Sequence, residues 1–486
     1  MSTTEHTSPG APGPGQARSA GPTYQELVAT DTHDVPVALR STSYQYQGSA
    51  DVAKSRYTSP AFAALEHEYV WSRTWQMACH VDDLPKAGSH IVYDVGDESL
   101  LVTRGSDGTI RAFHNACLHR GTKLRTEAGR VASFRCPFHG WTWDLEGDLV
   151  DMPCEWDFPQ ITEDPARTSL PEAQVALWEG WVMVNMDPAA EAFETYASVL
   201  VEHFAEYDMK SRYKAFHAVK EVEANWKVLM EAFAEAYHVI ATHPQIVEFS
   251  GDANSEYSIW PDQPHVTRFV NAFAVQSPHL SDTLSEQQIT DSYLAFSSRS
   301  KDAATPEVAD GASARSVVAD VFRQRMAGAF KADLSGKSDA EMLDAILYNM
   351  FPAFAPWGGM GQSIVYRWRP GRTPDTCFMD VIRMAQVPDE GPRPEPAPTT
   401  VLTLDQKWSE APGMSGLAAV FEQDMANLPR VQAGLKSSGK RTVTFGNYQE
   451  ARLRLYHRLL DRYIVEGLTA DGRSLDEVRP FLVGND

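Results

Sequence analysis

The sequence predicts an α+β protein with a small all-β domain and a larger domain in which a curved antiparallel sheet wraps around a long helix. Three strand-like runs at 91–95, 99–104 and 110–113 are separated by turns rich in Gly, Asp and Ser, and they predict a β-meander. A stretch at 225–244 is dominated by Ala, Leu, Met and Glu and predicts a helix. Two later strand-like runs flank a Pro-Gly pair at 370–371 and predict a hairpin.

The boundaries of these parts follow from shifts in composition. The small β-domain is expected over 45–165, and the larger domain over 23–44 and 166–486. Residues 1–22 are rich in Pro, Gly, Ser and Thr and almost lack large apolar side chains, so we expect them to be disordered. A polar segment with helical stretches at 277–345 interrupts the larger domain. It is either a surface excursion or a lid over a pocket.

Composition excludes several classes of partner. The chain has 486 residues and a formal net charge of −22, from 65 acidic and 43 basic residues. This balance argues against binding to nucleic acid or to an anionic membrane surface. No run approaches the roughly 18 apolar residues of a membrane span, and the N-terminus has no secretory signal pattern. The cysteines are few and scattered, so we expect no disulfide framework and a reducing, cytoplasmic location.

The first chemical motif is a pair of loops that each offer one thiol and one imidazole. Cys117 and His119 form a C-x-H pair, Cys136 and His139 form a C-x-x-H pair, and 16 residues lie between His119 and Cys136. Two sulfur and two nitrogen ligands are what a Rieske [2Fe–2S] cluster needs, with both cysteines on one iron and both histidines on the other. A Cys₂His₂ zinc site is the alternative, although zinc ligands usually come as C-x₂₋₄-C followed by H-x₃₋₅-H.

The second motif lies on the predicted helix at 225–244. Glu231, Glu235 and His238 are spaced at i, i+4 and i+7 and would share one helix face. His243 lies roughly 140° away on a regular helix, but Pro244 disfavours helical geometry there and could let that imidazole turn back toward His238. Two imidazoles and one carboxylate make the facial triad of non-haem Fe(II) oxygenases. The alternative is a purely structural histidine pair.

The third motif must supply the carboxylate, and an acidic segment near residue 424 is the candidate. It reads F-E-Q-D-M-A-N-L-P-R-V-Q-A-G-L from residue 421 onward. Residue chemistry alone does not choose between Glu422 and Asp424, and either could belong to a solvated helix face.

The three motifs, in this order, resemble the large (α) subunit of the Rieske non-haem iron ring-hydroxylating oxygenases. The resemblance spans most of residues 45–470, and it includes the pattern N-W-K-x₃-E-x₃-E-x-Y-H-x₄-H-P. It implies that His238, His243 and Asp424 hold mononuclear Fe(II), and that Glu235 bridges the two metal centres. It also implies a helix-grip catalytic domain. The spacing before His238 resembles the subfamilies that lack a small β subunit.

The resemblance further implies an oxygenase component that receives electrons from a separate NAD(P)H-dependent reductase, directly or through a ferredoxin. Such a component uses O₂ to hydroxylate or dihydroxylate a substrate and works as a ring-shaped homotrimer. An apolar, aromatic segment at 346–357 favours a hydrophobic, aromatic substrate. Three alternatives stay open: a monooxygenase that performs O- or N-dealkylation, a Rieske electron carrier, and a ligand-binding protein of helix-grip fold.

Overall fold

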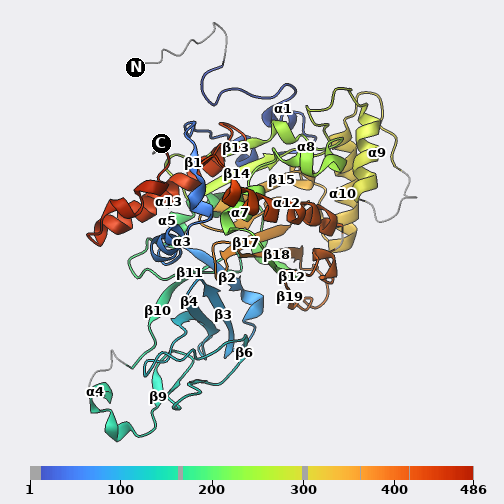
Figure 1. Ribbon diagram of the computed structural model, residues 1–486. Helices are drawn as coiled ribbons and strands as arrows, with labels where there is room; N and C mark the ends of the chain where they lie inside the picture. The colour runs from blue at the N-terminus through green and yellow to red at the C-terminus, as the bar shows by residue number, and fades with distance from the viewer. Residues whose placement is uncertain (1–11, 163–167, 298–304, 362, 415, 485–486) are drawn as a thin grey trace, which may run out of the picture.

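The computed structural model describes residues 12–162, 168–297, 305–361, 363–414 and 416–484. It has a β-rich lower part and a larger upper part in which helices and a sheet pack together (Figure 1). No described helix is both long enough and apolar enough to cross a membrane.

The lower part is built on a seven-stranded antiparallel sheet, with a three-stranded sheet beside it. The predicted meander is confirmed, because the third, fourth and fifth strands pair in sequence order, with Val102 opposite Ile91 on one side and Ala112 on the other. The large sheet runs in the order β2 (Gln76–His80), β11 (Trp181–Asn185), β10 (Glu172–Trp178), β5 (Ile110–His114), β4 (Glu98–Arg104), β3 (Ser89–Val95) and β6 (Gly129–Arg130). The small sheet contains β7 (Phe134–Arg135), β8 (Thr142–Trp143) and β9 (Leu149–Asp151).

The upper part is built on an eight-stranded sheet. The predicted hairpin is confirmed, since Pro370 pairs with Cys377 at the turn between two long antiparallel strands. The sheet is antiparallel except where β12 and β19 pair in parallel, so it is mixed and not purely antiparallel as predicted. Its order is β13 (Glu256–Ile259), β14 (Val266–Asn271), β15 (Ala345–Met350), β16 (Phe354–Pro356), β17 (Ile364–Pro370), β18 (Cys377–Gln386), β12 (Arg212–Val222) and β19 (Thr399–Leu402). A two-stranded sheet joins β1 (Val52–Ala53) to β20 (Thr442–Val443).

Three helices share a hydrophobic core with this sheet: α7 (Trp226–Ala232), α12 (Leu417–Ser437) and α13 (Ala451–Ala470). The same core includes side chains of the lower part, such as Tyr93 and Leu100, so the two parts are joined by continuous apolar packing. The other α-helices are α1 (Tyr24–Val28), α2 (Val37–Arg40), α3 (Pro60–Glu66), α4 (Pro159–Thr162), α5 (Phe193–Tyr196), α6 (Ser198–Phe204), α8 (Val239–Thr242), α9 (Glu286–Ser297), α10 (Ala314–Phe330) and α11 (Asp339–Leu343).

The continuous helix predicted over 225–244 is wrong. Helix α7 ends at Ala232, and α8 begins only at Val239. Two backbone groups in between bond to distant side chains: the Ala234 carbonyl accepts a hydrogen bond from Arg452, and the Ala236 N–H donates to the Tyr257 hydroxyl. Because Tyr257 takes the N–H that would continue the helix, helix propensity is overridden by tertiary contacts.

Two predicted segments fall partly outside the described residues. In the segment 277–345, helices α9, α10 and α11 are described and residues 298–304 are not. In the predicted disordered tail, residues 1–11 lie outside the described residues. Residues 12–22 run along the upper part, where the guanidinium of Arg18 lies 3.3 Å from the ring centroid of Tyr448.

Candidate metal centres

Two imidazoles and one carboxylate converge in the upper part. Ligand atoms of His238, His243 and Asp424 all lie within 4.8 Å of one another. The Nε2 atoms of His243 and His238 lie 3.1 and 3.8 Å from the same carboxylate oxygen of Asp424. Asp424 and His243 are buried, and His238 is half-buried. This set offers two nitrogens and one oxygen to a single ion, which is the facial arrangement that non-haem Fe(II) takes.

Local backbone geometry brings the two histidines together. His238 immediately precedes the single-turn helix α8, and His243 ends it with a non-helical backbone (φ −124°, ψ 52°) before Pro244. The two imidazole centroids are consequently 5.2 Å apart. The sequence argument for a distorted helix end at Pro244 is confirmed, although the helix it ends is much shorter than predicted.

A hydrogen bond at Nδ1 orients each of the two imidazoles. Nδ1 of His238 lies 2.7 Å from the carboxylate of Glu235, and Nδ1 of His243 lies 2.9 Å from Oε1 of Gln423. Since these oxygens accept, each Nδ1 carries the proton, and each Nε2 keeps a free lone pair for a metal. Burial alone would lower the pKa of His238, but the carboxylates of Glu235 and Asp424 outweigh it and raise that pKa.

The structure separates the candidate acids. Asp424 faces the histidines, whereas Glu422 lies toward Ser409, whose backbone N–H is 3.4 Å from the Glu422 carboxylate.

Glu231 does not share a face with Glu235 as predicted, because the helix ends between them. It accepts hydrogen bonds from the hydroxyl of Tyr57 and from the imidazole of a buried histidine on α13, both at 2.9 Å. Burial raises the pKa of Glu231 to about 8.

Sequence reasoning missed Gln423. It lies next to the predicted ligand Asp424, but its role depends on contact with His243, 180 residues earlier in the chain. No local pattern reports such a contact. An amide or acid beside a candidate ligand would have been the one usable signal, because metal-binding imidazoles commonly donate to such groups.

The second set of ligands lies on two loops of the lower part. Cys117 and Cys136 are buried, His119 is half-buried and His139 is exposed. The two imidazole centroids are 4.5 Å apart. Each cysteine begins a tight turn whose fifth residue is a glycine with positive φ, Gly121 (77°) after Cys117 and Gly140 (85°) after Cys136. These turns hold the two thiols inside and the two imidazoles closer to the surface.

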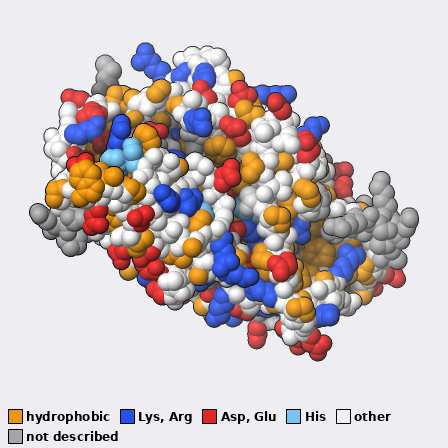
Figure 2. Space-filling model, turned by 90° about the horizontal axis from the view of Figure 1, so that it is seen from below, with side chains coloured by type: hydrophobic (Ala, Val, Ile, Leu, Met, Phe, Trp, Pro, Cys, Tyr) orange, Lys and Arg blue, Asp and Glu red, His pale blue; other side chains and the backbone are white. Residues whose placement is uncertain are grey.

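The residues fit an iron–sulfur cluster. Nδ1 of His119 is buried and has no hydrogen-bond partner among the described residues, which leaves its lone pair for a metal. Burial raises the pKa of the Cys136 thiol, but the backbone N–H groups of Phe138 and His139 outweigh it and lower that pKa. Such N–H groups stabilise negative charge on cluster sulfurs. Figure 2 shows histidine and hydrophobic side chains together at one end of the face seen there. Phe138, which lies between Cys136 and His139 in the second loop, has 59% of its surface exposed, and Trp156 has 80%.

Aromatic side chains gather behind Asp424. Phe421 lies one turn before it on α12, and its ring centroid is 5.5 Å from Phe233, 6.0 Å from Tyr366 and 5.3 Å from Trp408. Burial raises the pKa of the Tyr366 phenol, and the charge of Asp424 raises it further. The triad therefore borders a largely buried cluster of aromatic side chains.

Comparison with known families matches both sets of residues. Residues 74–162 match the Rieske [2Fe–2S] domain, a range that contains both Cys/His loops. Residues 201–466 match the catalytic domain of the ring-hydroxylating α subunit, a range that contains Glu235 and the triad.

Individual relatives divide into two groups. The glycine betaine monooxygenase oxygenase subunit of Chromohalobacter salexigens is 28% identical over 295 residues, which cover 59% of this chain and 63% of the relative. The chlorobenzene dioxygenase α subunit of a Cupriavidus species is 30% identical over 226 residues, covering 44% and 50%. The matches thus span less than two thirds of either relative. A crystal structure of naphthalene 1,2-dioxygenase is 17% identical with a TM-score of 0.61, covers 90% of this chain and 96% of that one, and shows the same fold.

Proposed function

Because the chain belongs to the Rieske oxygenase α subunits, we propose that it oxygenates a hydrophobic, aromatic substrate with O₂. His238, His243 and Asp424 would hold the mononuclear ferrous ion, and Cys117 with Cys136 and the two loop histidines would hold the cluster. When bound, the cluster supplies single electrons and the ferrous ion binds O₂ beside the substrate. The observation that carries the proposal is the triad itself. Nδ1 of each imidazole is held by a hydrogen bond, and both Nε2 atoms lie close to the same carboxylate oxygen of Asp424, so the three groups could bind one ion.

We propose that Glu235 is the bridge between the two metal centres. One carboxylate oxygen accepts from Nδ1 of His238 at 2.7 Å, and the other accepts from the backbone N–H of the same residue at 3.1 Å. Each oxygen retains a further lone pair for a donor from another surface. Glu235 itself is only 9% exposed, but Tyr237, two residues later, has 54% of its surface exposed, so the turn reaches the surface of the subunit.

The donor to that face would be a second copy of the chain. In Figure 1 the cluster loops lie in the lower part, near β6 and β9, whereas α8 and α12 lie in the upper part. A head-to-tail ring would bring the lower part of one subunit against the upper part of the next. We propose a homotrimer of this kind, served in the cytoplasm by a separate reductase, directly or through a ferredoxin.

A second candidate reaction is oxidative N-dealkylation of a quaternary ammonium compound. The observation that favours it is the similarity to the glycine betaine monooxygenase oxygenase subunit. The charges that raise the pKa of His238 are all carboxylates, from Glu235, Asp424 and Asp252, which suits a cationic or neutral substrate.

Product analysis with ¹⁸O₂ tests the function. The purified protein, loaded with iron and supplied with a reconstituted reductase, would be given aromatic compounds and quaternary ammonium compounds in parallel. We expect ¹⁸O in a ring-hydroxylated product. A dealkylated amine formed together with an aldehyde, in proportion to the O₂ consumed, would instead support the second reaction. If neither a labelled ring-hydroxylated product nor a dealkylated amine forms while both metal centres are filled, the proposed function is refuted.

A further inference from the structure

Glu235 lies in a six-residue turn that owes its shape to side chains from elsewhere in the chain. The turn runs from Phe233 to His238 between α7 and α8. It breaks a stretch of strong helix formers, so the backbone there needs outside partners to leave the helical path. The partners bond to the residues on either side of Glu235.

Arg452, on α13, holds the residue before Glu235. Its guanidinium donates to the Ala234 carbonyl at 3.0 Å. The same guanidinium donates to Thr267 at 3.0 Å and to Asn349 at 2.6 Å, so two neighbouring sheet strands fix its position. Arg452 is 2% exposed. A planar guanidinium with three such bonds has little freedom, and it locates the carbonyl that it binds.

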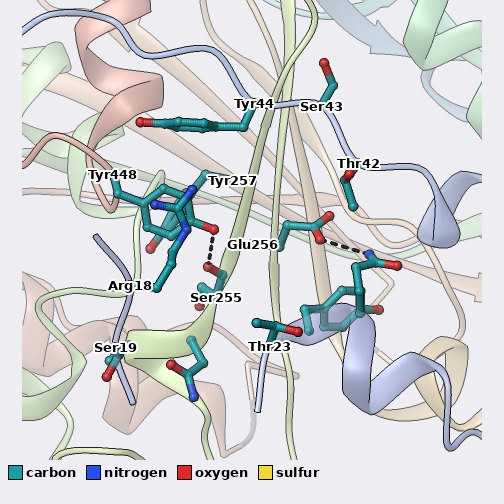
Figure 3. Close-up of a pocket in the computed structure, with 14 residues that line it drawn as sticks. Arg18, Ser19, Thr23, Thr42, Ser43, Tyr44, Ser255, Glu256, Tyr257 and Tyr448 are labelled. Atoms are coloured by element: carbon teal, nitrogen blue, oxygen red, sulfur yellow. Dashed lines mark hydrogen bonds between the residues drawn. The ribbon is translucent and has the colours of Figure 1, made fainter. Parts of the chain in front are cut away.

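Tyr257, on β13, holds the residue after Glu235. Its hydroxyl oxygen accepts the Ala236 N–H at 3.1 Å, and the side chain is 1% exposed. Burial raises the pKa of Tyr257, so the hydroxyl stays neutral. Tyr448 packs edge-on against the ring at 5.3 Å, and the Arg18 guanidinium covers Tyr448 (Figure 3).

We propose that Arg452 and Tyr257 are positioning residues for Glu235, which fix the residues on both sides of it and so align its carboxylate with His238. The proposal rests on the bridging role given to Glu235 above. A carboxylate must hold its partner within a few tenths of an ångström to keep a 2.7 Å contact with Nδ1, and a flexible turn would not do so.

Tyr257→Phe tests this with one atom removed. The ring and its packing stay, but the Ala236 N–H loses its acceptor. Tyr448→Phe is the matched control, because the Tyr448 ring packs against Tyr257. The Tyr448 hydroxyl donates to the Ser255 carbonyl at 3.2 Å and not to the turn that carries Glu235. Arg452→Lys serves as a second variant, since it keeps the charge and loses the fork that binds Ala234.

Two readouts separate positioning from mere stability. The first is the EPR spectrum of the ferrous site in the intact, iron-loaded protein exposed to nitric oxide, at matched iron content. The second is the rate at which the reduced cluster is reoxidised by O₂ with indole as an aromatic probe. We expect Tyr257→Phe and Arg452→Lys to shift the EPR signal and to slow reoxidation by about tenfold or more. Tyr448→Phe should match the wild type in both.

The outcomes are distinguishable. If Tyr257→Phe and Arg452→Lys match Tyr448→Phe in both readouts, while Glu235→Gln reoxidises slowly, the positioning role is overturned and the bridge stands. If Glu235→Gln itself reoxidises at the wild-type rate, the bridge fails and the positioning role fails with it. A fall in melting temperature with an unchanged EPR signal and reoxidation rate marks a purely structural role and also overturns the proposal.

Discussion

Replacing Gln423 with leucine should weaken iron binding without disturbing the cluster. Oε1 of Gln423 accepts the Nδ1 proton of His243 at 2.9 Å and also accepts from Gln245 at 2.7 Å. Leucine has nearly the same size but no acceptor. The proton of His243 can then move to Nε2, and the tautomer that offers a lone pair to the metal is no longer enforced.

The size of the expected loss in Fe(II) affinity depends on how exposed Gln423 is to water. Loss of a hydrogen bond to a ligating imidazole typically costs 10- to 100-fold in metal affinity, or about 1.4 to 2.8 kcal/mol. Gln423 is half-buried, so water can partly replace it as an acceptor. We therefore expect the lower end of this range, an affinity for Fe(II) weakened about tenfold.

Competition with a ferrous chelator measures this affinity, with cluster absorbance as the internal standard for folded protein. Gln245→Leu is the matched control, because it removes the neighbour of Gln423 and leaves the bond to His243 intact. An unchanged affinity in Gln423→Leu, or an equal loss in Gln245→Leu, would refute the argument that Gln423 sets the tautomer.

Three further predictions address the acids. Asp424→Ala should lose mononuclear iron and turnover while keeping the visible cluster spectrum; undiminished oxygenation would remove Asp424 from the triad. Glu235→Gln should keep both metal centres and slow reoxidation of the reduced cluster, and stopped-flow absorbance decides this. Glu231 has its pKa raised to about 8 by burial, so it is protonated when folded and ionised when unfolded at neutral pH. Its contribution to stability is present below about pH 4.5 and is lost as pH rises toward 8, by at most about 1.4 kcal/mol per unit. Thermal melts from pH 5 to 8 should show wild type losing stability relative to Glu231→Gln, and parallel curves would contradict the shifted pKa.

Motifs with short spacing could be predicted from the sequence, because their geometry is local. The C-x-H and C-x-x-H pairs each lie within one turn, and Gly121 and Gly140 supply the positive φ that those turns require. The hairpin at Pro370 and the meander from residue 89 are likewise encoded by neighbouring residues. Asp424 depended on the family resemblance, since helix periodicity treats it and Glu422 alike.

Features set by distant contacts could not be predicted. The break in the helix after Ala232 occurs in a stretch whose composition favours helix, and its cause lies at Tyr257 and Arg452, about 20 and 220 residues away. The role of Gln423 could not be predicted for the same reason, because its partner His243 is 180 residues away in the chain. Glu231 was expected to face the site because a regular helix would carry it there, and the same break turns it toward Tyr57 instead.

Rescue between two inactive variants tests the central claim, that the cluster of one subunit serves the iron of the next. Cys117→Ser would lack the cluster and His243→Ala would lack the mononuclear iron, so each assembly alone should be inactive. Random co-assembly in a head-to-tail ring pairs an intact cluster with an intact iron at roughly one interface in four. Co-expressed chains should therefore recover about a quarter of the wild-type activity per subunit. Mixed assemblies that are verified by mass and remain inactive would contradict the claim, because electrons would then have to pass within a single chain.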